Sequence, residues 1–166
     1  MGRPVAQAHV EIEAPIELVW QVMLDVGAYG RWNPFIHRVD ASGEAMRIGS
    51  AFRLHVRWPE GGGASSGEVV TVLDPPAPDG ALRRGAWEYE FTGWLARLGL
   101  VRATRTQHVE QRDGGPTIWR TREEFRGALA ALIPLAKVQA GFDAHAAALK
   151  QRAESLARAG SPSRAG

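Results

Sequence analysis

The 166-residue sequence contains no cysteine, which excludes disulfides, thiolate chemistry and cysteine metal ligands. No stretch approaches the roughly 18 consecutive apolar residues that a membrane-spanning helix needs, and residues 1–5 lack the apolar run of a secretion signal. Net charge is nearly absent as well, since 20 basic and 18 acidic residues leave only +2, weak evidence for nucleic acid. These absences predict a cytoplasmic protein with no integral membrane association and no nucleic acid partner.

What is present is the composition of an ordinary globular protein, with 45% hydrophobic and 23% charged residues. The length suits one domain with a sizeable core. We expect a single domain over residues 1–159. Residues 160–166 (GSPSRAG) are small and mostly polar, and we expect them to form a disordered tail.

Hydrophobic periodicity predicts one strand, two short helices, a run of strands and one long helix. Residues 7–14 alternate as a half-buried strand; Pro15 then suits a first helical turn, and a second short helix or turn reaches Trp32. Asp74-Pro75-Pro76 is expected to end the strand that begins at Glu68, and glycine-rich residues 60–66 to form a hairpin loop. The later strands are predicted at 35–39, 51–58, 68–73, 86–91, 101–112 and 117–126.

Residues 134–156 carry an apolar stripe at steps of three and four, which predicts a helix about 35 Å long. This order predicts an α+β fold in which the last helix covers one face of a sheet. If the strands bend round the helix, a pocket lies between them, and we expect function there.

The last hairpin, which turns at residues 113–116, predicts which side chains face the helix. If the turn centres on Gly114, Arg105 faces Glu123 and Gln107 faces Thr121, on the same side of the sheet as Trp119. A buried Arg–Glu pair adds little stability, so an inward pair indicates a pocket that holds a carboxylate, carbonyl or hydroxyl. The alternatives are a pair half in water at the rim of the sheet, or a register slip that turns both outward.

Apolar side chains complete the predicted pocket. Trp87, Tyr89 and Phe142 fall on the apolar sides of their elements; each alone is ordinary core, but six tryptophans in 166 residues suit a planar apolar ligand. His37 shares alternation with Phe35, and His145 flanks the helical stripe, so both could touch the pocket. No histidine pair has metal-ligand spacing and no phosphate or dinucleotide motif is present, so we expect no metal and no cofactor.

Four segments resemble the START-like SRPBCC superfamily: residues 10–25 (VEIEAPIELVWQVMLD), 32–35 (WNPF), 122–127 (REEFRG) and 141–154 (GFDAHAAALKQRAE). The resemblance covers residues 7–156. It implies a helix-grip fold, in which a curved seven-stranded antiparallel sheet wraps around the long C-terminal helix, with two short helices after the first strand. Glu123 stands where such relatives carry the first Glu of an E-x-F-x-G motif. Many of them carry histidine where this chain has Arg105, which weakens the case for a shared acid–base mechanism.

Three functions follow. The first is binding or carriage of a small hydrophobic, aromatic or lipid-like ligand, with Arg105, Gln107, Thr121 and Glu123 orienting its polar end. The second is a polyketide cyclase/dehydrase-type enzyme without cofactor, in which Glu123 is the candidate general base. The third is a module that binds a protein partner through exposed apolar residues near Trp94. The sequence leaves the oligomeric state open, between monomer and dimer.

Overall fold

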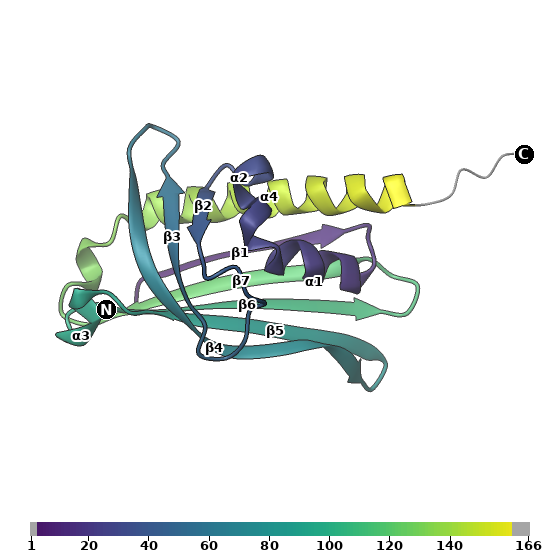
Figure 1. Cartoon of the computed structure of the whole chain (residues 1–166), viewed down its shortest axis with the longest axis horizontal. Helices are drawn as coiled ribbons and strands as arrows, with labels where there is room; N and C mark the ends of the chain where they lie inside the picture. Colours follow the sequence, from purple (N-terminus) through teal and green to yellow (C-terminus); the bar gives the residue numbers. More distant parts are fainter. Residues whose placement is uncertain (1–2, 161–166) are drawn as a thin grey trace, which may run out of the picture.

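The computed structural model describes residues 3–160 (Figure 1). Seven strands form one antiparallel sheet in the order β1-β7-β6-β5-β4-β3-β2. The strands are β1 (Val5–Ile12), β2 (Ile36–Asp40), β3 (Ala51–Arg57), β4 (Gly63–Asp79), β5 (Leu82–Phe91), β6 (Arg102–Arg112) and β7 (Thr117–Arg126). The helices are α1 (Ile16–Leu24), η1 (Val26–Ala28), α2 (Tyr29–Trp32), α3 (Trp94–Arg97), η2 (Ala130–Leu132) and α4 (Leu135–Gly160).

Helix α4 lies along one face of the sheet, with α1 and α2 beside it (Figure 1). Its apolar stripe is buried against the sheet, as the three–four spacing predicts. The backbone N–H and C=O of Gln7, on the edge strand β1, bind the side-chain amide of Gln139 at 3.1 and 2.8 Å. Helix α4 therefore covers one open edge of the sheet. The buried members of the stripe are Val138, Phe142, Ala146, Leu149 and Ala153.

The α+β helix-grip fold predicted from the sequence is confirmed, with two short helices after the first strand and the longest helix last. The register of the β6–β7 hairpin is also confirmed: Arg105 pairs with Glu123, and Gln107 with Thr121. Helix α4 continues to Gly160, four residues beyond the predicted end. Of the predicted tail, Gly160 is helical, and 161–166 lie outside the described residues.

The predicted end of the fourth strand was wrong. Strand β4 runs for 17 residues, from Gly63 to Asp79, so it begins inside the expected hairpin loop and continues beyond the two prolines. Pairing with β5 skips from Asp74 to Ala77, and this bulge leaves Pro75 and Pro76 unpaired. A bulge is where a strand tolerates a residue that has no N–H to donate.

Gly127 shapes the end of the sheet where β7 leaves it. Its φ of +110° lies outside the range of L side chains, and a Cβ there would meet the Leu100 carbonyl oxygen at 2.4 Å. We expect Gly127→Ala to lower the free energy of unfolding by about 2–4 kcal/mol, measured by urea denaturation. Gly99→Ala is the control, because φ is +69° there and nothing lies within 4 Å. Equal losses in the two variants would contradict a steric role for the Leu100 carbonyl.

Candidate functional site

A cavity of about 230 Å³ lies between the sheet and α4. Ala64 and Pro134 line it and are also exposed, so its mouth lies between the β3–β4 hairpin and the start of α4. The ion pair between Lys137 and Glu60, at 4.0 Å, joins these two elements. The walls are almost entirely apolar: Phe35, Leu54, Val56, Trp58, Phe91, Leu95, Val101, Ala103, Phe125, Ile133, Val138 and Phe142.

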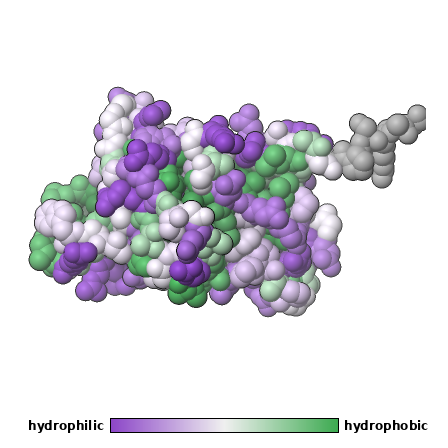
Figure 2. Space-filling view, viewed as in Figure 1, coloured by the Kyte–Doolittle hydropathy of each residue, from purple (hydrophilic) through white to green (hydrophobic). Residues whose placement is uncertain are grey.

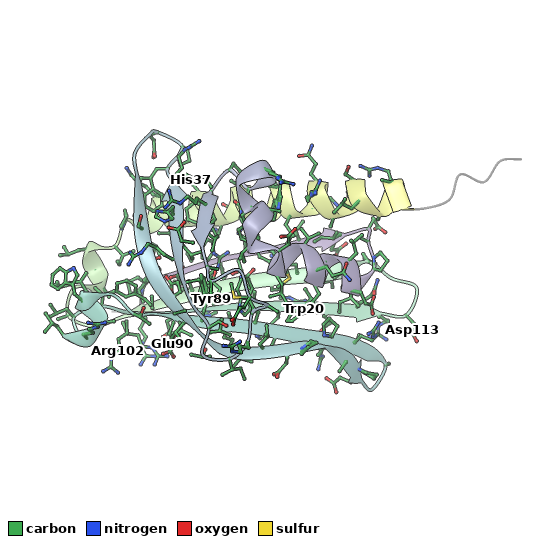
Figure 3. The ribbon with its side chains drawn as sticks, viewed as in Figure 1. Trp20, His37, Tyr89, Glu90, Arg102 and Asp113 are labelled. Atoms are coloured by element: carbon green, nitrogen blue, oxygen red, sulfur yellow. The ribbon has the colours of Figure 1, made fainter. Side chains whose placement is uncertain are left out.

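One row of polar side chains crosses the sheet at the inner end of this cavity. Antiparallel pairing places Glu123 of β7 beside Arg105 of β6, and Arg105 beside Tyr89 of β5. All three line the cavity; Figure 3 labels Tyr89 near the middle of the sheet. Side chains of residues paired across neighbouring strands lie on the same face of a sheet, so this polar row is the floor of a largely apolar hollow. We name Glu123, Arg105 and Tyr89 the polar floor.

Beyond the polar floor the interior is solid. The next row holds Thr121, Gln107 and Trp87, each no more than 2% exposed, and none of them lines the cavity. Helices α1 and α2 cover this half of the sheet and fill it with aromatic side chains. The rings of Tyr29, Trp32 and Trp119 surround His145 at centroid distances of 5.8, 5.8 and 5.3 Å.

Arg105 is a buried cation, 3% exposed. Its Nε donates to Thr121 Oγ1 at 3.0 Å and its Nη2 to His145 Nδ1 at 3.2 Å. Its guanidinium carbon lies 4.1 Å from the ring centroid of Phe142, a cation–π contact that partly replaces lost hydration. These contacts hold the guanidinium fork in one orientation at the edge of the cavity.

His145 serves Arg105 as a neutral acceptor. Burial, and then the neighbouring Arg105 guanidinium, hold the pKa of His145 well below its usual range. Because Nδ1 accepts from Arg105, its single ring proton is assigned to Nε2. His145 therefore positions Arg105 from behind the cavity wall.

Glu123 points into the hollow without a direct partner. Burial raises the pKa of Glu123 to about 7, although the Arg105 guanidinium lowers it. Within residues 3–160, no ion pair of 4.0 Å or less joins this carboxyl to Arg105. Arg105 and Glu123 are thus cross-strand neighbours, as predicted, but they do not form an ion pair, and each side chain lines the cavity separately.

Glu68 is a second cavity carboxyl, which was not predicted from the sequence. It lies on β4 opposite Phe52, is 7% exposed, and lines the cavity. Burial raises the pKa of Glu68 to about 8; a hydrogen bond with Ser66 lowers it, Glu123 raises it further, and Arg105 lowers it. Near neutral pH, Glu68 is therefore mainly a protonated donor, while Glu123 is about half ionised.

Stability should depend on the proton at Glu68. The folded pKa of about 8 lies above the unmodified value of 4.5, so this stabilisation is full below pH 4.5 and is lost as pH rises through 8. We expect Glu68→Gln to match the wild type near pH 4.5 and to exceed its free energy of unfolding at pH 8.5, by on the order of 3 kcal/mol. Urea denaturation at both pH values measures this.

Glu124, the outward neighbour of Glu123, is the control of opposite sign. Hydrogen bonds from Arg126 and Arg3 lower the pKa of Glu124 to about 2, so its contribution is present above pH 4.5 and is lost as pH falls towards 2. Glu124→Gln should therefore lower stability at pH 8.5. A gain in both variants at pH 8.5 would refute the burial of Glu68.

Four of the ten predicted site residues line the cavity: Tyr89, Arg105, Glu123 and Phe142. The other six do not: five of them lie in the far half of the interior, over which α1 and α2 pack, and the sixth is His37. His37 is turned away from the cavity: the β2–β3 pairing is irregular between Ile36 and Arg38, so Ile36 is buried while His37 stacks on the outward His55, with ring centroids 6.3 Å apart. The six are Gln107, Trp119, Thr121, Trp87, His145 and His37.

From residue 3 to residue 160, no cluster of three or more His, Asp or Glu side chains is placed to hold a metal ion. Over the same range, none of the helices combines the length and hydropathy needed to cross a bilayer.

The chain matches a protein-family model and resembles several solved structures. The model described as "Polyketide cyclase / dehydrase and lipid transport" matches residues 3–158. The aromatase/cyclase ZhuI of Streptomyces sp. R1128 superposes with a TM-score of 0.70 at 22% identity, over 96% of this chain and 99% of ZhuI. A search of curated proteins finds no significant match.

Two further solved structures have the same fold. A START superfamily protein of Mycobacterium smegmatis gives a TM-score of 0.65 at 20% identity, over 93% of this chain and 99% of the other. A hypothetical protein of Helicobacter pylori gives 0.66 at 14% identity, over 90% and 87%. At these identities the likeness establishes the fold alone.

Proposed function

Because the chain belongs to the polyketide cyclase/dehydrase and lipid transport family, we propose that it binds a small hydrophobic or aromatic molecule in the cavity between the sheet and α4. The observation that carries this proposal is an apolar hollow of about 230 Å³ with one polar floor. An apolar cavity of roughly 150 Å³ accommodates benzene, so the size here suits one or two fused rings.

The polar groups specify the end of the ligand that reaches the floor. Arg105 and Glu68 line the cavity, and because burial raises the pKa of Glu68 to about 8, both can donate a hydrogen bond to a ligand near neutral pH. Glu123 can accept one in its ionised form. Two donors that converge in an apolar space favour an oxygen acceptor on the ligand. The ligand is therefore a ring system with a carbonyl, hydroxyl or carboxylate at one end.

Titration with 2-naphthol, a two-ring probe with one hydroxyl, tests this function. We expect a Kd on the order of 10–100 µM by isothermal titration calorimetry, and about tenfold weaker binding of 2-methylnaphthalene, which has the same shape without the oxygen. No detectable heat with either probe, from protein shown to be free of co-purified ligand, would contradict the proposal.

A second candidate function is proton-transfer catalysis, favoured by the position of Glu123. With a pKa of about 7 and no ion pair of 4.0 Å or less within residues 3–160, its carboxylate can take a proton from carbon between two carbonyls, as a general base near its operating pH does. The enolate carbon then attacks another carbonyl of the same substrate, and Glu123 returns the proton to the new alkoxide. Arg105 stabilises the enolate oxygen.

Progress curves on a short poly-β-ketone separate the two functions. Catalysis by Glu123 predicts a loss of at least about 100-fold in kcat for Glu123→Gln, while binding of 2-naphthol stays within a few-fold. Equal rates for the variant and the wild type would remove the catalytic function and leave the binding function intact.

A further inference from the structure

Two segments at the cavity mouth form one surface, which we call the collar: residues 91–102 around α3 and residues 126–137 around η2. The backbone N–H of Leu129 donates to the Leu100 carbonyl at 2.9 Å, so the segments lie side by side, at the end of the sheet seen on the left of Figure 1. Leu95 and Ile133 line the cavity from within. The collar is therefore both a wall of the cavity and an outer surface.

The outer side of the collar is unusually apolar. Trp94, Leu98 and Leu132 are 67%, 65% and 75% exposed, and Figure 2 shows hydrophobic residues gathered at the same end. Of the four large hydrophobic side chains exposed in the described residues, only Ile48 lies outside the collar. Clustering of this kind, in contrast to scattered apolar residues, marks an interaction surface.

The charge of the collar indicates what binds there. Its 24 residues contain four of the 20 basic residues of the chain and none of the 18 acidic ones, so the rest of the chain is slightly acidic. Arg97 and Arg102 have no ion-pair partner within residues 3–160, and Figure 3 shows Arg102 at the α3 end. The other two are Arg126, bound to Glu124, and Lys137, at 4.0 Å from Glu60.

We propose that the collar docks reversibly on an anionic lipid surface, with Trp94, Leu98 and Leu132 at the headgroup level and the arginines against lipid phosphates. Exposed tryptophan and leucine beside unpaired cations suit such an interface, because one supplies apolar area and the other electrostatic attraction. A second copy of the chain is disfavoured, since a twofold contact through the collar would bring two basic surfaces together. Docking here would place the cavity mouth near the bilayer, and it does not depend on which ligand the cavity holds.

Co-sedimentation of the full chain with vesicles tests the docking. We expect binding to vesicles with 30% phosphatidylglycerol, and about tenfold weaker or no binding to pure phosphatidylcholine or in 0.5 M NaCl. Trp94→Ser with Leu98→Ser, and separately Arg97→Gln with Arg102→Gln, should each reduce partitioning about tenfold or more. All four side chains are exposed, and circular dichroism confirms that the variants fold.

Matched controls carry the same chemical changes elsewhere. Ile48→Ser removes an apolar side chain of equal exposure (64%), and Arg53→Gln with Arg120→Gln removes two exposed cations outside the collar; neither should change partitioning. The proposal is overturned if anionic vesicles do not bind the wild type, or if the controls lose as much as the collar variants. A dimer in sedimentation velocity that Trp94→Ser with Leu98→Ser dissociates would also overturn it, since the collar would then be a protein interface.

Discussion

Replacing Ala103 by phenylalanine is expected to weaken the binding of 2-naphthol at least about 100-fold while the protein stays folded. Ala103 is 8% exposed and lines the cavity on β6. A phenyl ring is close in size to the benzene that fills a cavity of roughly 150 Å³, so it occupies more than half of the 230 Å³ present. Because the ring enters existing space, it should cause little of the strain that accompanies overpacking of a solid core.

Thr104→Phe is the matched control for this variant. Thr104 is the next residue on β6 and does not line the cavity, since successive strand residues point to opposite faces. Calorimetric titration should show no binding for Ala103→Phe and nearly unchanged affinity for Thr104→Phe, with both thermal midpoints within a few degrees of the wild type. Undiminished binding to Ala103→Phe would mean that 2-naphthol binds somewhere else.

Replacing Arg105 by methionine is expected to remove the preference for an oxygen-bearing ligand. Methionine keeps an unbranched side chain against Phe142 but cannot donate, and a hydrogen bond to a charged group contributes roughly 1.5–3 kcal/mol. The affinity for 2-naphthol should therefore fall about tenfold, which is its whole advantage over 2-methylnaphthalene, while 2-methylnaphthalene binds as before. The two affinities converge in the variant.

Two additional measurements separate binding from folding in this variant. Since Arg105 lowers the pKa of Glu123, the carboxyl should titrate above pH 7 in Arg105→Met, as followed by 13C NMR of the Glu123 carboxyl. Arg120→Met, an exposed arginine on the outer face, should change neither affinity nor titration. An equal loss of affinity for both probes would show that Arg105 maintains the shape of the cavity and does not recognise oxygen.

The order of elements and the last hairpin were predictable because their signals are local. The DGGP turn at residues 113–116 determines which residues pair, and pairing alone places Arg105 beside Glu123 on the inner face. The long helix follows equally from one apolar stripe. Both predictions depend only on residues that are close in sequence or that pair across one hairpin.

The extent of the hollow was not predictable in this way. Whether an inward residue meets packed side chains or empty space depends on α1 and α2, which pack over only part of the sheet. Trp87 and Trp119 fall under these helices and are 1% and 0% exposed, whereas Tyr89, one inward position along from Trp87, meets the cavity. The alternation of residues along a strand predicts which face of the sheet a side chain lies on. Whether that side chain meets other packed side chains or a cavity depends on the three-dimensional packing.

Glu68 was missed for a different reason. The hairpin arithmetic that located Glu123 would also have located Glu68, since β3 pairs Phe52 with Glu68 and Leu54 with Ser66. The glycine-rich stretch predicts a loop as far as Ser66, which excludes four of the seven β3–β4 pairs, those of residues 63–66. The connection between β3 and β4 is only residues 58–62, where the Gly61 N–H donates to the Trp58 carbonyl and Gly61 and Gly62 have positive φ. The strand therefore begins at Gly63.

A crystal structure of the protein soaked with 6-bromo-2-naphthol tests the central claim most directly. We expect one anomalous bromine peak among the apolar residues of the cavity, such as Leu54, Phe125 and Val138, with the naphthol oxygen within hydrogen-bond distance of Arg105 or Glu68. A bromine peak only on the outer surface, or a cavity closed by its own side chains in that crystal, would contradict the account.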